Sequence, residues 1–85
     1  MYVNQYQAAI LQLLEDSPIV SPQVIDDVRV SVRSGEVELA FTTLCEWIYE
    51  DDLTITRAFY ERLVAIAPDL NSEGLVGGLV SQVVD

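Results

Sequence analysis

Carboxylates are the side chains of this sequence with the greatest capacity for chemistry or binding. They gather as an adjacent pair, Asp26 and Asp27, and as a dense group made of Glu46, Glu50, Asp51 and Asp52. Adjacent residues of a helix point in directions too divergent to share a substrate as acid and base. Residues 46–52 also lack the 1-3-5 ligand spacing and the glycine of a calcium-binding loop. The acids therefore favour a charged binding surface over a catalytic or metal site.

The sequence has one cysteine and no histidine, which restricts its chemistry further. Histidine is the commonest general base and zinc ligand, and a single cysteine forms neither an intramolecular disulfide nor a cysteine metal cluster. Cys45 lies among apolar residues with no base nearby, so we expect it to pack in the core. We expect a protein that is not an enzyme and that holds no cofactor and no metal.

The charge of the chain limits its partners. Fourteen acidic residues stand against four basic ones, for a net charge of −10. Binding to nucleic acid needs Lys and Arg for the phosphates, and an anionic membrane would repel this chain. The apolar stretch 74–84 is too short to cross a bilayer, and residues 1–5 lack the cationic start of a signal peptide. We expect a cytoplasmic protein with a cationic protein partner, and neither nucleic acid nor membrane.

Eighty-five residues with 51% hydrophobic side chains suit one domain, residues 1–85, with a thin core. Apolar residues three and four positions apart predict helices over 2–15, 22–33, 36–51 and 56–68, with Ser21 and Thr56 as N-caps. In the tail, 71–85, apolar residues recur every four positions, which suits a fifth helix that Gly77 and Gly78 weaken. The fold prediction is all-α, a small antiparallel bundle of four helices, with the fifth left open.

A β-hairpin is the rival interpretation of the middle of the chain. Residues 28–33 and 36–41 both alternate apolar and polar side chains around a turn with Gly35, which is typical of a hairpin and would give an α+β fold. Val30 distinguishes the two. It points away from Val28 in a helix and shares the face of Val28 in a strand.

Short connections favour antiparallel neighbours, so the first and third helices should run in the same direction. Their acidic ends, at 15–16 and 46–52, then meet at one end of the molecule, with Arg29 and Arg33 toward the other. Trp47 and Tyr49 lie among these acids, and aromatics mixed with charges are the usual anchors of an interface, with packing in the core as the alternative. Trp47 lies one position off the apolar stripe, so we expect it to be partly exposed. The predicted partner-binding residues are Glu46, Trp47, Glu50, Asp51 and Asp52, together with Asp26 and Asp27. A merely solvated surface is the alternative.

Residues 34–41 (SGEVELAF) and 44–50 (LCEWIYE) resemble small bacterial immunity proteins of the MafI type. Those chains carry a Gly-Glu step, a Leu-Ala pair, a Leu-Cys pair and an acidic helix end. The resemblance covers roughly residues 24–70. It implies an all-α protein that binds and neutralises a cognate secreted toxin domain, often a nuclease, in the cytoplasm, as in contact-dependent inhibition between bacteria.

Two other functions fit the size, acidity and helicity of the chain. One is an acyl-carrier-like protein, although the required Asp-Ser-Leu is replaced by Asp16-Ser17-Pro18. The other is a homo-oligomeric helical adaptor, which would self-associate weakly through an exposed apolar stripe in the tail. That stripe consists of Leu75, Val76, Leu79 and Val80.

Overall fold

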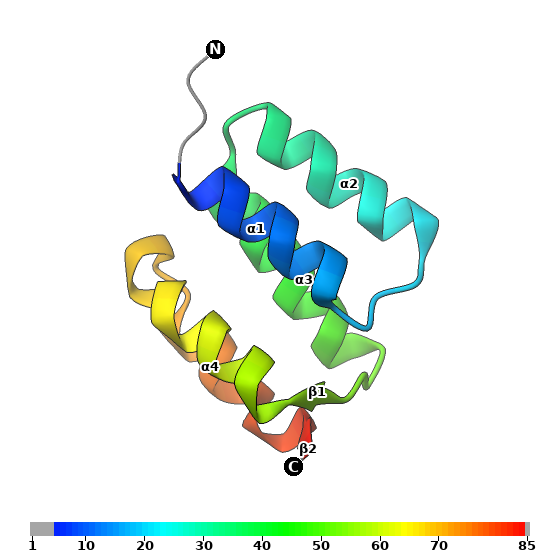
Figure 1. Ribbon diagram of the computed structural model, residues 1–85, viewed down its shortest axis with the longest axis vertical. Coiled ribbons are helices and arrows are strands. Elements are labelled where there is room, and N and C mark those ends of the chain that lie inside the picture. Colours follow the sequence, from blue (N-terminus) through cyan, green and yellow to red (C-terminus); the bar gives the residue numbers. More distant parts are fainter. Residues whose placement is uncertain (1–4, 85) are drawn as a thin grey trace.

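The first half of the chain forms three antiparallel helices. The structure, a computed structural model, describes residues 5–84. It contains α1 (Gln5–Asp16), α2 (Pro22–Arg33) and α3 (Val37–Glu50). As Figure 1 shows, α1 and α3 run in the same direction and α2 runs in the opposite one. The prediction of an all-α antiparallel bundle is confirmed, while the predicted start of the first helix, including Val3, lies outside the described residues.

The second half is built from shorter elements. Strand β1 (Ile55–Thr56) leads into α4 (Arg57–Ile66) and the 3-10 helix η1 (Ala67–Leu70). These are followed by α5 (Glu73–Gly77), the 3-10 helix η2 (Gly78–Gln82) and strand β2 (Val83–Val84). The two strands pair in parallel, with Ile55 opposite Val83 (Figure 1). This pairing was not predicted, because two-residue strands are too short to show an alternating pattern.

The hairpin alternative is wrong, because residues 28–33 and 37–41 are helical. Val28 has no exposed surface, whereas Val30 is 45% exposed, as expected for a helix and not for a strand. Burial at every fourth position, from Val24 through Val28 to Val32, explains why the helical period prevails. Gly35, at a φ of +80°, then lets the chain turn into α3.

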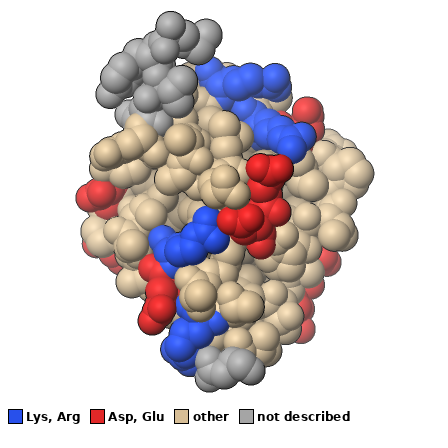
Figure 2. Space-filling model, in the orientation of Figure 1, with Lys and Arg blue, Asp and Glu red and all other residues tan. Residues whose placement is uncertain are grey.

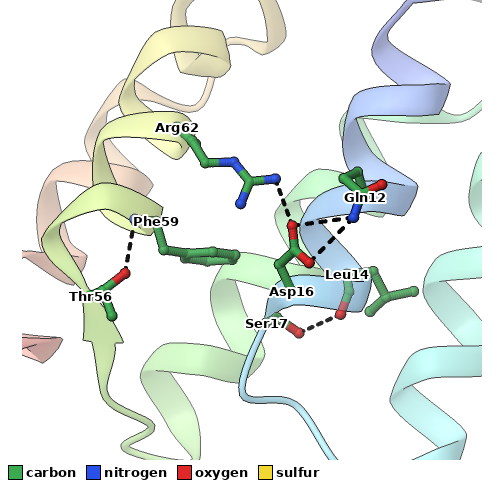
Figure 3. Close-up of polar contacts among 7 residues, drawn as sticks. All are labelled: Gln12, Leu14, Asp16, Ser17, Thr56, Phe59 and Arg62. Carbon is green, nitrogen blue, oxygen red and sulfur yellow. Dashed lines mark hydrogen bonds and ion pairs between the residues drawn. The ribbon is translucent and has the colours of Figure 1, made fainter.

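The caps of the helices were predicted in part. Thr56 caps α4 as expected, since its hydroxyl oxygen accepts a hydrogen bond from the Phe59 backbone N–H at 3.1 Å (Figure 3). Ser21 occupies the N-cap position of α2, but its side chain makes no capping hydrogen bond. Pro68 is expected to stop or bend the fourth helix, and α4 does end just before it, at Ile66. Pro68 lies inside η1, where its fixed φ suits a tight helical turn.

Helix α3 is the centre of the core. It packs against α1, α2, α5 and both 3-10 helices. Phe41, Leu44 and Ile48 are fully buried on it, and so is Cys45, as predicted. Burial raises the pKa of the Cys45 thiol to about 12, because the thiolate would lose its hydration.

The exposed apolar stripe predicted in the tail is wrong. Val76 and Leu79 are buried, Leu75 is partly buried, and Val80 is exposed. The reason is tertiary: α5 and η2 pack against α3, which covers the side of the tail that carries Val76 and Leu79. Self-association through all four side chains therefore has no continuous surface to use.

Candidate partner-binding surface

Helix α3 ends in a left-handed turn that presents its acids. The N–H of Leu53 donates to the carbonyl of Ile48 at 3.0 Å, and the N–H of Asp52 donates to that of Tyr49 at 3.2 Å. Asp52 adopts a φ of +50°. These are the bonds of a Schellman motif, with Asp52 in the place that glycine usually takes. The chain thus reverses directly after α3 and leaves the side chains of Asp51 and Asp52 exposed.

The charge at this end of α3 has no cationic partner among the described residues, 5–84. We call it the acidic end of α3, and it consists of Glu46, Glu50, Asp51 and Asp52, all exposed. No ion pair to any of the four is formed within residues 5–84. Acids near a helix C-terminus cost about 0.3–1 kcal/mol each, and like charges one turn apart cost about 0.2–0.5 kcal/mol more. Four carboxylates thus stand where folding alone disfavours them.

Two aromatic residues lie beside the acidic end of α3. Trp47 is partly buried and packs against the core, as its position off the apolar stripe predicted. Tyr49 is 57% exposed. Tyr49 is one of the two aromatics expected among the acids but is not among the predicted partner-binding residues, although its place three positions after Glu46 puts it on the solvent side of the helix. An exposed tyrosine among charges is a frequent interface anchor.

The acidic end of α1 differs, because it is partly neutralised. The guanidinium of Arg62 lies 3.0 Å from the carboxylate of Asp16. The side-chain amide of Gln12 also donates to both oxygens of that carboxylate, at 3.3 and 3.2 Å (Figure 3). Asp16 therefore serves the contact between α1 and α4. The acidic end of α3 has no comparable ion pair within residues 5–84.

Asp26 and Asp27 are exposed on α2, but they are not level with the end of α3. Because α2 and α3 are antiparallel and joined by residues 34–36, Asp27 lies at about the level of Thr43. Glu50 is seven residues farther along α3, which is about 10 Å at the rise of an α-helix. The two aspartates can extend the candidate surface along one side but do not form part of the acidic end of α3.

Charge on the rest of the surface is mixed. On the face in Figure 2, arginine side chains lie at the top, near the middle and at the bottom, with acidic side chains between them. Exposed acids also occur outside residues 46–52, at Glu36, Glu38, Glu61, Asp69 and Glu73. The solvated-surface interpretation suits these scattered acids. Residues 46–52 stand apart by density, with four acids in seven positions.

The hollows and polar groups elsewhere offer weaker sites. A hollow of about 200 Å³ lies between α4 and α5, and one of about 330 Å³ lies between α1 and α4, both with mostly apolar linings. Within residues 5–84, no cluster of three or more His, Cys, Asp or Glu is arranged to hold a metal ion. In the same range, no helix has both the length and the apolar character needed to cross a membrane.

The serine that an acyl-carrier function would need is already engaged. The hydroxyl of Ser17 donates to the carbonyl of Leu14 at 2.7 Å (Figure 3), and its oxygen accepts from the N–H of Ile19 at 3.3 Å. Both bonds hold the turn after α1. Ser17 is therefore a structural residue of that turn.

Comparison of the chain with protein-family models, with curated proteins and with solved structures finds no match. The interpretation of the candidate surface rests on the geometry and charges described above.

Proposed function

We propose that this protein is an immunity protein that binds and neutralises a cognate secreted bacterial toxin domain in the cytoplasm. It acts as an inhibitor and not as an enzyme. One observation carries the proposal: four carboxylates within residues 46–52 have no ion pair within residues 5–84, and an exposed tyrosine lies among them. Such a surface suits a partner that brings the missing positive charge.

A nuclease toxin supplies that charge. A nuclease holds the phosphates of its substrate with Lys and Arg, so its cleft is cationic. The acidic end of α3 can occupy such a cleft by presenting carboxylates in place of phosphates. Opposite charge also accelerates encounter, by about 10- to 1000-fold at low salt. Fast binding is useful for an inhibitor that must act before its toxin does.

The resemblance to MafI-type immunity proteins supports the same proposal. It spans roughly residues 24–70, which fold as α2, α3, β1, α4 and η1. Its acidic helix end corresponds to the acidic end of α3.

Growth rescue tests the function directly. The probe is the C-terminal domain of the secreted protein encoded next to this gene, produced inside a bacterial host. We expect that domain to stop growth and co-production of this protein to restore it. The proposal fails if no such toxin is encoded there, or if growth stays arrested although both proteins are present and folded.

Binding kinetics test the surface. The test variant combines Glu50→Gln, Asp51→Asn and Asp52→Asn, which removes three charges and keeps side-chain shape. The matched control combines Glu36→Gln, Glu38→Gln and Glu61→Gln, which changes the net charge equally, from −10 to −7. At low salt we expect the test variant to associate with the toxin domain about 10-fold more slowly and with a flatter salt dependence. Equal rates for the two variants would reject the surface.

A further inference from the structure

The C-terminal segment is fastened to the turn that ends α3. The side-chain amide of Gln82 donates to Oδ1 of Asp52 and to the carbonyl oxygen of Leu53, both at 3.0 Å. Gln82 is 8% exposed, although its neighbours Ser81 and Val84 are exposed. Glutamine is seldom this buried, and a buried amide must find hydrogen-bond partners. The side-chain oxygen of Gln82 accepts from the hydroxyl of Ser81 at 3.2 Å, while both acceptors of its NH₂ group belong to the turn after α3.

The parallel strands bring the segment to this place. Pairing of β2 with β1 sets Val83 opposite Ile55, and η2 packs against α3. Figure 1 shows β2 beside β1, just beyond the end of α3. Gln82, which directly precedes β2, is thereby placed beside Asp52 and Leu53. The hydrogen bonds from Gln82 to Asp52 and Leu53 thus join residues that are 30 and 29 positions apart in the chain.

The turn needs such support. Asp52 holds a left-handed conformation that costs most residues other than glycine free energy. A turn of this kind on the surface opens easily unless other groups fix it. Gln82 bonds both to the side chain of Asp52 and to the backbone of the next residue, so it restrains the turn at two points.

Glutamine also leaves the charge of the turn intact. An Arg or Lys at position 82 would hold Asp52 equally well but would neutralise its carboxylate. The neutral amide contacts Oδ1, while Oδ2 accepts no hydrogen bond within residues 5–84. The carboxylate is thus oriented and still available to a cation.

We propose that Gln82 is a positioning residue of the partner-binding surface: it fastens the C-terminal segment to the turn and holds the carboxylates of Asp51 and Asp52 ready for a cationic partner. This role rests on the proposed function. A surface ordered before binding loses less conformational freedom on docking, so the complex is tighter. Nothing in the sequence singles out Gln82, since one glutamine in an apolar tail carries no signal of its contacts.

The test replaces Gln82 with Met, which keeps the volume of the side chain and removes its amide. The matched control is Gln7→Met, because the amide of Gln7 also donates to a backbone carbonyl, that of Val32, at 2.8 Å, and lies away from the turn. The first measurement is amide hydrogen exchange in the free protein. We expect the Leu53 N–H to exchange about 10-fold faster in Q82M than in Q7M, after correction for global stability.

The second measurement is binding to the same toxin domain. We expect Q82M to weaken binding about 5- to 10-fold and Q7M to leave it unchanged. Equal exchange rates of the Leu53 N–H in Q82M and Q7M would show that Gln82 does not restrain the turn. Faster exchange with unchanged binding overturns the positioning role while the proposed function stands, provided that the E50Q/D51N/D52N variant binds slowly. If the triple variant associates as fast as its control, both the proposed binding surface and the role of Gln82 are rejected.

Discussion

The guanidinium of Arg62 lies 3.0 Å from the carboxylate of Asp16, and this ion pair joins α4 to the end of α1 (Figure 3). The same guanidinium lies 5.7 Å from the centre of the Phe59 ring. One cation thus partly neutralises the acidic end of α1 and stacks on an aromatic ring of its own helix, α4. The C-terminal ends of α1 and α3 have similarly acidic sequences, but within residues 5–84 only the end of α1 has an ion pair. This contrast makes the acidic end of α3 distinctive.

The Arg62–Asp16 pair should contribute little to stability. Both side chains are 43% exposed, and exposed pairs are worth about 0.2–1 kcal/mol. We expect Arg62→Ala to lower the free energy of unfolding by about 1 kcal/mol, because it also removes the contact with Phe59. Asp16→Asn should cost less, since it also reduces the net charge from −10 to −9. Urea denaturation in low and high salt measures both. A larger loss for Asp16→Asn than for Arg62→Ala would contradict this account.

Asp52 should respond differently to two conservative changes. Asp52→Asn keeps an acceptor for Gln82 and a residue type that tolerates the left-handed region, so we expect a change within about 0.5 kcal/mol. Asp52→Ala removes the polar side chain that helps a residue tolerate a φ of +50° and that accepts from Gln82, and we expect a loss of about 1–2 kcal/mol. The measurement is again urea denaturation. Asp51→Ala is the control, since Asp51 has a negative φ, and an equal loss in both alanine variants would refute the strain.

Stability should fall in alkali through Cys45. Burial raises the pKa of the Cys45 thiol from 9.0 to about 12, so the folded protein keeps the proton that the unfolded chain releases. Because the pKa is higher in the folded state, the protonated thiol contributes its full share of the folding stability below pH 9. This contribution is lost as the pH rises toward 12. Relative to Cys45→Ala, we expect the wild type to lose about 1 kcal/mol between pH 9 and pH 10. All other side chains are the same in both proteins, so their contributions to the pH dependence cancel. If the free energies of unfolding of the wild type and Cys45→Ala differ by the same amount at pH 9 and pH 10, the thiol ionises in the folded state as it does in the unfolded chain. That result would contradict the prediction.

Local patterns in the sequence determined most of the helical architecture. The three- and four-residue spacing of apolar side chains placed α1, α2, α3 and α4, because burying one face of a helix is what stabilises it. The same spacing predicted the burial of Cys45 and the partial exposure of Trp47. The acids of residues 46–52 were visible directly, since charge density is a property of the sequence.

Contacts between distant segments were decided by the tertiary structure alone. The sequence could not show that Arg62 would pair with Asp16, because the two residues are 46 positions apart, nor that the acidic end of α3 would have no ion pair within residues 5–84. It also misjudged the tail, since the same apolar spacing suits an exposed stripe and a face packed on α3. Hydrophobic periodicity says which side chains share a face, while the packing of the whole chain decides what covers that face and where Gln82 finds its partners.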